Sequence, residues 1–291
     1  MPVEPPIEVP RTLVEAFDVL ASAPHRPIAG GTDVMVQISG EIGPPPDRMI
    51  DLWRLQELRG IRLADGVLAI GALETYTDIR RSALCRELVP ALVEAAATIG
   101  AAQIQNRGTL GGNIANASPA GDTLPVLLAL DATIVVGSQR GERSIPAADF
   151  WIAYRRTALE PDELVLRVLV PPPVGREIRF RKIGTRRAQA ISKVVMALAW
   201  RPGADADGDG DGGAWRDVRL GLGSVAERPI RAAKTEAVLE GARPTTETAD
   251  RAAETLAGEI QPIDDVRSTA DYRRVVAARV LHRLIRDAGG W

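Results

Sequence analysis

Residues 103–122, Gln-Ile-Gln-Asn-Arg-Gly-Thr-Leu-Gly-Gly-Asn-Ile-Ala-Asn-Ala-Ser-Pro-Ala-Gly-Asp, form the most distinctive stretch of this 291-residue chain. The stretch is rich in Gly, Asn, Ser and Thr and holds neither Lys nor Glu, so it does not have the composition of an ordinary solvated loop. At its centre Thr109 precedes the pair Gly111-Gly112, and Asn113 follows it. Successive glycines let a backbone adopt positive φ angles and approach a ligand closely. The stretch therefore predicts a segment with a special backbone requirement.

A second glycine pair, Gly30-Gly31, lies between two expected ordered segments and is followed by Thr32. Consecutive main-chain amides in such loops form a concave cradle for an anion, and a threonine hydroxyl adds a donor. Two such loops would hold a pyrophosphate without Lys or Arg. The alternative is that both pairs are turns required only for packing, because Gly-Gly is a common turn signal. Spacing alone leaves both interpretations open.

The overall composition narrows the class of protein. Hydrophobic residues make up 45% and charged residues 25% of the chain, as in a soluble globular protein, and the length predicts two domains at about 150 residues each. A net charge of −2 argues against a protein that binds nucleic acid, which would carry a basic excess. No apolar run approaches the ~20 residues that span a bilayer, and residues 1–11 lack a signal-peptide pattern, so we expect a cytoplasmic protein.

Metal-binding and nucleotide-binding motifs are largely missing. The single cysteine, Cys85, excludes an intramolecular disulfide and a Cys-ligated iron–sulfur cluster within this chain. The sequence contains no G-x-G-x-x-G dinucleotide fingerprint set between a strand and a helix of a βαβ unit. It also contains no phosphate-binding G-x-x-x-x-G-K-S/T loop and no G-x-S-x-G nucleophile motif. Asp alternates within residues 203–213 as in a calcium-binding loop, with Gly210 in sixth place, but Arg216 occupies the twelfth position where a Glu is required. We interpret that segment as a hairpin loop.

Apolar periodicity and turn signals predict an α+β chain in two parts. Thr12 opens a helix with a capping-box pattern that runs to about Ala21. The first part is expected to contain a buried helix at 90–102 and strands at 49–52, 67–72, 132–136 and 163–170. The stiff run Pro171-Pro172-Pro173 is expected to end it. The second part is expected to hold an antiparallel sheet of strands 178–183, 191–200 and 215–222, followed by helices at 230–239, 246–257 and 270–288.

A few residues outside the glycine pairs are candidates for packing or for function. Asp122 is either a ligand contact for a sugar hydroxyl or an N-cap before Leu124. Lys182, on an expected strand, is either a site residue or part of a solvated charged face. Cys85 is expected to pack in a helix, and His282 is expected to lie at the surface or at its boundary with the interior. The last helix is expected to bury one apolar stripe, made of Tyr272, Val275, Val276, Val280, Leu281 and Leu284.

Four segments taken together resemble the FAD-binding subunit of the molybdenum hydroxylase family, which includes xanthine dehydrogenases and carbon monoxide dehydrogenases. They are Ile-Ala-Gly-Gly-Thr-Asp at 28–33, Ile-Gly-Ala-Leu-Glu-Thr at 70–75, the block 103–131, and Lys-Ile-Gly-Thr-Arg-Arg at 182–187. The central block is long and specific, and the resemblance covers nearly the whole chain. It favours the pyrophosphate-binding interpretation of the two glycine pairs.

The resemblance implies a fold and a role for each matched residue. A two-subdomain FAD-binding domain of the PCMH type would occupy residues 1–173, with subdomains of about 1–55 and 56–173. A C-terminal α+β domain of antiparallel sheet and helices, similar to that of carbon monoxide dehydrogenase flavoproteins, would occupy 174–291. The pyrophosphate would be lined on one side by Ala29, Gly30, Gly31, Thr32, Asp33 and Val34, and on the other by Thr109, Gly111, Gly112 and Asn113. Asp122 would contact the polar sugar portion of FAD, Lys182 would lie near the isoalloxazine ring, and Ile99 and Ala115 would flank the flavin.

By the same resemblance, the chain is an oxidoreductase subunit that transfers electrons through FAD and holds no catalytic residue or metal. A small partner subunit with two [2Fe–2S] clusters would supply the electrons, and a large partner subunit with the molybdenum cofactor would oxidise the substrate. FAD would pass the electrons to NAD or another acceptor, in a dimer of heterotrimers. Residues 106–109, 116–122 and 154–159 are most similar to bacterial xanthine dehydrogenase-type subunits. The alternatives are a stand-alone FAD oxidase or diaphorase and a flavin-free interaction subunit.

Overall fold

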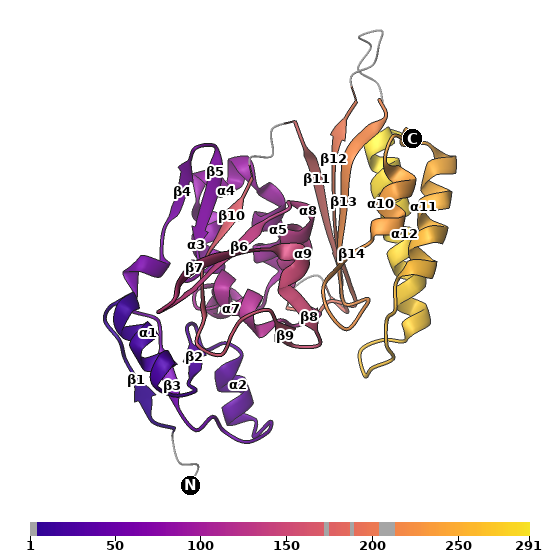
Figure 1. The fold of residues 1–291 in the computed structure, drawn as a ribbon. Helices are drawn as coiled ribbons and strands as arrows, with labels where there is room; N and C mark the ends of the chain where they lie inside the picture. Colours follow the sequence, from indigo (N-terminus) through magenta and orange to yellow (C-terminus); the bar gives the residue numbers. More distant parts are fainter. Residues whose placement is uncertain (1–4, 172–174, 187–188, 204–212) are drawn as a thin grey trace.

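The computed structural model describes residues 5–171, 175–186, 189–203 and 213–291, which form two α+β domains side by side (Figure 1). The expected fold class is confirmed, including a C-terminal antiparallel sheet with helices. Most of the Asp-rich loop at 203–213 lies outside the described residues, as do Pro172, Pro173 and Arg187.

The chain begins with a small parallel sheet in the order β1-β3-β2. Its elements are β1 (Ile7–Glu8), α1 (Leu13–Ser22), β2 (Arg26–Ile28), α2 (Val34–Ser39) and β3 (Met49–Asp51). Helix α1 begins where expected, because the Thr12 hydroxyl accepts a hydrogen bond from Glu15 N at 3.2 Å. The Glu15 carboxylate in turn accepts one from Arg11 N at 2.7 Å. The first of these bonds satisfies an amide that the first helical turn leaves without a partner, and the second joins that turn to the residue before the N-cap.

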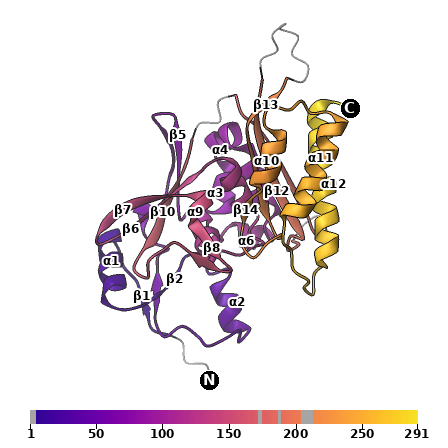
Figure 2. The ribbon, with the colours of Figure 1, turned by 45° about the vertical axis from the view of Figure 1, so that its right-hand side comes forward.

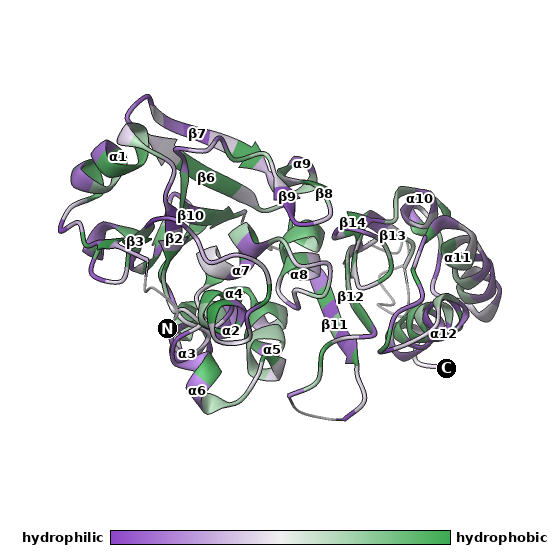
Figure 3. Ribbon diagram, turned by 90° about the horizontal axis from the view of Figure 1, so that it is seen from below, coloured by the Kyte–Doolittle hydropathy of each residue, from purple (hydrophilic) through white to green (hydrophobic). Residues whose placement is uncertain are grey.

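A five-stranded antiparallel sheet in the order β4-β5-β10-β6-β7 forms the centre of the first domain. Its strands are β4 (Ile61–Ala64), β5 (Val67–Gly71), β10 (Leu164–Val170), β6 (Thr133–Ser138) and β7 (Gly141–Pro146). The helices between β5 and β6 are α3 (Tyr76–Arg81), α4 (Ala83–Leu88), α5 (Pro90–Thr98), α6 (Ala102–Gln105), α7 (Leu110–Asn116) and α8 (Leu124–Ala129). All of them except α6 contribute residues to the apolar core that the sheet also lines. In Figure 3 the buried strand β6 is largely green, whereas the edge strand β7 is largely purple.

Shorter elements connect these larger ones. A 3-10 turn, Gln56–Leu58, precedes β4, and α9 (Ala147–Phe150), β8 (Trp151–Ala153) and β9 (Arg156–Thr157) lie between β7 and β10. On the face of the sheet opposite the α3–α8 helices, α1 residues Ala16 and Leu20 join Leu164 and Leu166 in a second core cluster. The first domain therefore has apolar layers on both faces of its central sheet.

The second domain is a four-stranded antiparallel sheet in the order β11-β12-β13-β14. Its strands are β11 (Glu177–Ile183), β12 (Val194–Pro202), β13 (Trp215–Gly223) and β14 (Ile230–Arg231), and its helices are α10 (Ala233–Leu239), α11 (Thr246–Glu259) and α12 (Ala270–Gly289). The helices cover the outer face of the sheet (Figure 2), while α8 of the first domain packs on its inner face. Side chains of β12 alternate between the two faces. Inward are Val195, Ala197 and Ala199, and outward are Val194, Met196, Leu198 and Trp200.

The structure differs from expectation at the last helix and at the start of α10. Helix α10 begins at Ala233, because Ile230–Arg231 pairs with β13 as a strand. The apolar stripe expected on α12 is wrong for Tyr272 and Val275, which are 43% and 48% exposed. That helix instead buries Arg273, whose guanidinium donates to Ser224 O at 2.8 Å and to Asp265 Oδ1 at 2.8 Å. The other four residues of the expected stripe, Val276, Val280, Leu281 and Leu284, pack in or against the core of the second domain.

Two expectations for single residues are confirmed. Cys85 is buried in α4, and His282 lies partly exposed on α12 beside Asp250. None of the helices in the described ranges is both long and apolar enough to cross a bilayer. Across those ranges, His, Cys, Asp and Glu side chains do not gather in threes as the ligands of a metal ion would.

Candidate functional site

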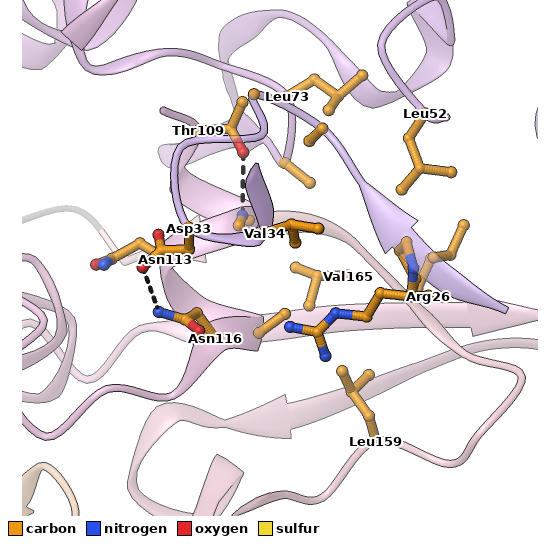
Figure 4. Close-up of a pocket in the computed structure, with 18 of the residues that line it drawn as sticks. Arg26, Asp33, Val34, Leu52, Leu73, Thr109, Asn113, Asn116, Leu159 and Val165 are labelled. Carbon is orange, nitrogen blue, oxygen red and sulfur yellow. Dashed lines mark hydrogen bonds between the residues drawn. The ribbon is translucent and has the colours of Figure 1, made fainter. Parts of the chain in front are cut away.

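A cavity of about 380 Å³ lies where the β2–α2 loop meets the N-terminus of α7 (Figure 4). Its walls also include the β5–α3 connection and the segment 155–165. It is lined by ten of the twelve residues expected to bind a cofactor, Ala29, Gly30, Gly31, Thr32, Asp33, Val34, Thr109, Gly111, Gly112 and Asn113. Two glycine pairs that lie far apart in the sequence therefore meet at one site.

The β2–α2 loop presents a row of unpaired main-chain amides. Within the described structure, the amides of residues 30–34 donate no hydrogen bond, whereas the next amide, Met35 N, donates to Gly31 O at 2.9 Å. Gly31 has a φ of +75°, the left-handed conformation that glycine adopts without steric cost. Successive amides in such a turn form a concave donor surface suited to phosphate oxygens.

Gly30 allows two loops to touch at the level of their backbones. A Cβ atom at position 30 would lie 1.8 Å from Arg107 O, so any side chain would push the β2–α2 loop away from the segment before α7. Gly108 is similarly close to the ring of Tyr76, because a Cβ there would lie 2.7 Å from Tyr76 Cε2. The first glycine pair therefore allows close packing and also contributes free amides, which are the two roles that the sequence suggested for it.

The second glycine pair behaves differently from expectation. Gly111 and Gly112 lie in the first turn of α7 without a positive φ, so the expectation of left-handed glycines is wrong here. Their amides are already used, since Gly111 N donates to Ala72 O at 2.8 Å and Gly112 N to Thr109 Oγ1 at 3.0 Å. A Cβ at Gly111 would lie 2.6 Å from Ala72 Cβ. The pair lets α7 approach the chain after β5, and the free amides of the cavity come from the first loop.

A chain of polar side chains links three segments at one side of the cavity. Asn116 Nδ2 donates to Asp33 Oδ1 at 3.1 Å, which joins α7 to the β2–α2 loop (Figure 4). The Asn116 amide oxygen accepts from Arg155 Nη1, also at 3.1 Å. The Asp33 carboxylate is therefore bound by the side-chain amide of Asn116, and the Arg155 guanidinium polarises that amide. The contacts fix the position of the loop that carries the free amides.

The opposite side of the cavity is apolar with one cationic side chain. Its wall includes the side chains of Leu52, Leu73, Leu159 and Val165. In Figure 4 the end of Arg26 lies between Val165 and Leu159. In the part of the chain that the structure describes, the Arg26 guanidinium has no hydrogen bond or ion pair. A flat cation beside aliphatic side chains suits an aromatic ring carried by an anionic ligand.

Asp122 and Lys182 lie outside the cavity and bind each other. Lys182 Nζ, on β11, lies 2.5 Å from Asp122 Oδ2 and 3.1 Å from Thr98 O, and both side chains are buried. Burial raises the pKa of Asp122 to about 6, although Lys182 acts in the opposite direction. The other carboxylate oxygen, Asp122 Oδ1, is buried without a partner among the described residues. Asp122 is not an N-cap, because Thr123 holds that position before α8.

One hydrogen bond extends from the cavity to the residue next to this ion pair. Asn113, which lines the cavity, accepts a hydrogen bond from the Thr123 hydroxyl at 2.5 Å, and Thr123 follows Asp122 directly. Polar groups therefore extend from the free amides to the contact between the two domains. Ala115 also lines the cavity, whereas Ile99 packs against the apolar core of the first domain.

The cavity residues that sequence reasoning missed include Arg26, Tyr76, Asn116 and Arg155. Asn116 and Arg155 stand in segments that carry the resemblance, but the resemblance assigned no role to them. Arg26 and Tyr76 each stand within a few residues of a matched motif, which is the only signal that the sequence contains for them.

The fold and the cavity define a class of protein, an α+β chain whose amide-lined site fits an extended anionic ligand with an aromatic end. Comparison with family models identifies that class. Residues 4–173 match the family described as "FAD binding domain in molybdopterin dehydrogenase", and residues 179–288 match "CO dehydrogenase flavoprotein C-terminal domain". The chain belongs to this family as a FAD-binding (medium) subunit of the molybdenum hydroxylases, and it is therefore an oxidoreductase subunit.

Individual relatives agree with the family match. The nicotinate dehydrogenase FAD-subunit of Eubacterium barkeri is 33% identical over 96% of this chain and 94% of its own length. The xanthine dehydrogenase FAD-binding subunit of Escherichia coli O157:H7 is 31% identical over 96% of this chain and 95% of its own. Among solved structures, the carbon monoxide dehydrogenase of Hydrogenophaga pseudoflava contains a chain with a TM-score of 0.90 and 29% identity, covering 97% of this chain and 96% of that one. Because these identities are so similar, the likeness to the xanthine dehydrogenase branch stays a prediction.

Proposed function

We propose that this chain is the electron-transfer subunit of a molybdenum-containing dehydrogenase, and that it holds FAD with its pyrophosphate on the amides of residues 30–34. The observation that carries the proposal is that row of free amides, fixed by the backbone contact between Gly30 and Arg107. Phosphate oxygens bound there satisfy donors that the protein itself leaves unpaired. A flavin-free interaction subunit would gain nothing from leaving these donors open.

The rest of the site supports one orientation of the dinucleotide, with its adenine end at the apolar wall and its flavin end towards Lys182. The apolar wall with Arg26 suits adenine, because a guanidinium stacks on aromatic rings. From the pyrophosphate, the sugar chain would follow Asn113 towards Asp122, whose unpaired Oδ1 can accept a hydrogen bond from a hydroxyl group. The isoalloxazine ring would then lie near Lys182, between a first domain of residues 1–173 and a second of 174–291. Lys182 would hold Asp122 in place and supply a positive charge near the ring.

The protein's own residues bind and orient the cofactor in this account. FAD supplies the chemistry when bound, since flavins exchange electrons singly or in pairs. The amides of the β2–α2 loop bind the phosphates, the chain of contacts from Arg155 through Asn116 to Asp33 fixes that loop, and buried aliphatic side chains exclude water from the adenine end. No acid or base catalysis is assigned to a side chain of this chain.

The proposed partners follow from the relatives. One solved structure that resembles this chain is described as a Cu,Mo-CO dehydrogenase. We expect a small subunit with [2Fe–2S] clusters to deliver electrons, a large subunit with the molybdenum cofactor to oxidise the substrate, and NAD or another acceptor to receive the electrons. With a single cysteine, this chain has too few thiolates for a Cys-ligated cluster of its own. We further expect a cytoplasmic dimer of heterotrimers.

Reduction of the flavin through the partner subunits tests the proposal. The chain is purified together with its iron–sulfur and molybdenum partners, and the complex is mixed anaerobically with substrate or with a chemical reductant of the clusters. We expect the flavin absorbance near 450 nm to bleach after the cluster bands and to return when NAD or a quinone is added. A flavin that reduces equally fast in the isolated chain and in the complex would contradict the role as electron-transfer subunit and favour a stand-alone diaphorase.

A further inference from the structure

Tyr76 is a buried polar residue of the cavity whose hydroxyl has no hydrogen-bond partner among the described residues. It is the first residue of α3, and its side chain is 4% exposed. The hydroxyl forms no hydrogen bond to any described residue. The protein nevertheless leaves part of the hydroxyl oxygen accessible. Tyr76 is also one of the residues that line the cavity.

The other buried polar side chains of the cavity wall are satisfied. The Thr109 hydroxyl caps α7 by accepting from Gly112 N, and the Glu163 carboxylate accepts from Arg143. A buried hydroxyl without a partner is costly, since it has lost its hydrogen bonds to water. Such a group at a ligand cavity points to a hydrogen bond that forms when the ligand binds.

Tyr76 also lies next to the free amides. Its ring packs on Gly108, and Gly108 N is one of the atoms that a Cβ at Gly30 would meet, at 3.1 Å. The ring is therefore separated from the β2–α2 loop by a single residue of backbone. The Asp33 carboxylate of that loop is close enough to act on the hydroxyl electrostatically.

The protonation state of the hydroxyl suits a donor. Burial raises the pKa of Tyr76 far above its usual value, and the charges of Asp33 and Asp122 add to the rise. The phenol is thus neutral throughout the physiological range and retains its proton. It can donate to an anionic oxygen without adding charge to the site, whereas Asp33 is already engaged by Asn116.

We propose that the Tyr76 hydroxyl donates a hydrogen bond to a pyrophosphate oxygen of FAD and so positions the dinucleotide against the β2–α2 loop. This inference rests on the proposed function, because it names a further contact of the same site. Tyr76 is a binding residue in this account and takes no part in electron transfer.

The test compares Tyr76→Phe with Tyr154→Phe. The matched control removes the hydroxyl of Tyr154, which is 59% exposed and lies outside the cavity wall. FAD is removed from the purified full-length chain and titrated back while flavin fluorescence is followed. Tyr76→Phe is expected to weaken FAD binding about tenfold or more, the usual effect of losing a hydrogen bond to a charged group, and Tyr154→Phe is expected to leave it unchanged. Neither variant loses a hydrogen bond within the described protein, so both should fold like the wild type.

A second readout locates the contact on the ligand. At saturating FAD, one of the two ³¹P resonances of the bound pyrophosphate is expected to shift in Tyr76→Phe, with the visible flavin spectrum unchanged. Unaltered affinity, or a changed flavin spectrum without a ³¹P shift, would overturn the proposal while leaving FAD binding intact. A wild-type chain that binds no FAD, with or without its partner subunits, would instead overturn the proposed function and this inference with it.

Discussion

Gly30 shows how one missing side chain determines the geometry of the cavity. Its backbone lies against Arg107 O so closely that even a methyl group would overlap it, at 1.8 Å. The neighbouring Gly31 supplies the left-handed turn. The two glycines of this pair therefore have different structural roles, which the sequence alone does not distinguish.

Replacing Gly30 by Ala tests this assignment. The added Cβ must displace the β2–α2 loop from the segment before α7, so we expect FAD affinity to fall at least tenfold and the unfolding free energy to fall by about 1–3 kcal/mol. Gly258→Ala is the matched control, because Gly258 lies in α11 with nothing within 4 Å of the added Cβ. Flavin titration and urea unfolding measure the two effects. Equal FAD affinity in both variants would show that loop position does not matter for binding.

Asp122 makes the stability of the flavin-free chain depend on pH. Burial raises its pKa to about 6, above the value of about 3.9 for an unfolded aspartate. The folded chain therefore holds this proton more tightly, and the stabilisation is complete below about pH 4 and is lost as the pH rises through about 6. We expect the contribution of this group to the unfolding free energy to fall by about 2–3 kcal/mol between pH 4 and pH 7.

Urea unfolding of the wild type and of Asp122→Asn across that pH range checks the expectation. The difference in unfolding free energy between the two proteins should change in favour of the variant as the pH rises. A difference that stays constant from pH 4 to pH 7 would mean that Asp122 has an ordinary pKa in the folded chain.

Among the elements, those with a clear period were predictable from the sequence and α7 was not. The strands β11, β12 and β13 were expected within three residues of their observed ends, because apolar runs and turn signals delimit them. Helix α7 contains Gly111 and Gly112 in its first turn, where intrinsic propensity opposes a helix. Its Thr109 cap and its contact with Ala72 overcome that propensity. The burial of Arg273 was also not predictable from the sequence, because its hydrogen-bond partners come from other segments of the chain.

Leu198 tests the two-sided packing of β12. Its side chain is fully buried and faces the α10–α12 helices, away from the cavity. Leu198→Ala is expected to lower the unfolding free energy by about 3 kcal/mol and to leave FAD affinity unchanged. Val266→Ala, at a fully exposed position, is the control and should change neither quantity. A large loss of FAD affinity in Leu198→Ala would show that the outer core controls the site.

At the scale of the whole molecule, the two domains share a core. Phe180 on β11 and Val195, Ala197 and Ala199 on β12 belong to the same apolar cluster as the first domain's sheet. Asp131, which precedes β6, accepts hydrogen bonds from Arg219 and Arg231 of the second domain. The resemblance predicted two domains. It did not predict that successive side chains of β12 alternate between the two cores, which only the structure shows.

Calorimetry measures the consequence of the shared core. Because neither domain can expose its face of β12 and β13 without losing apolar contacts, we expect one cooperative unfolding transition for the flavin-free chain. Two separate transitions would show that the domains are stable independently and that the contact between them is weak.

The absorption spectrum of the purified protein shows whether this chain carries FAD. The chain is isolated both alone and together with its iron–sulfur and molybdenum partners, and the released chromophore is identified by chromatography. We expect one FAD per copy of this chain, with no iron–sulfur absorbance from the chain itself. A chain that is colourless in both preparations, or that releases a chromophore other than FAD, would contradict this expectation.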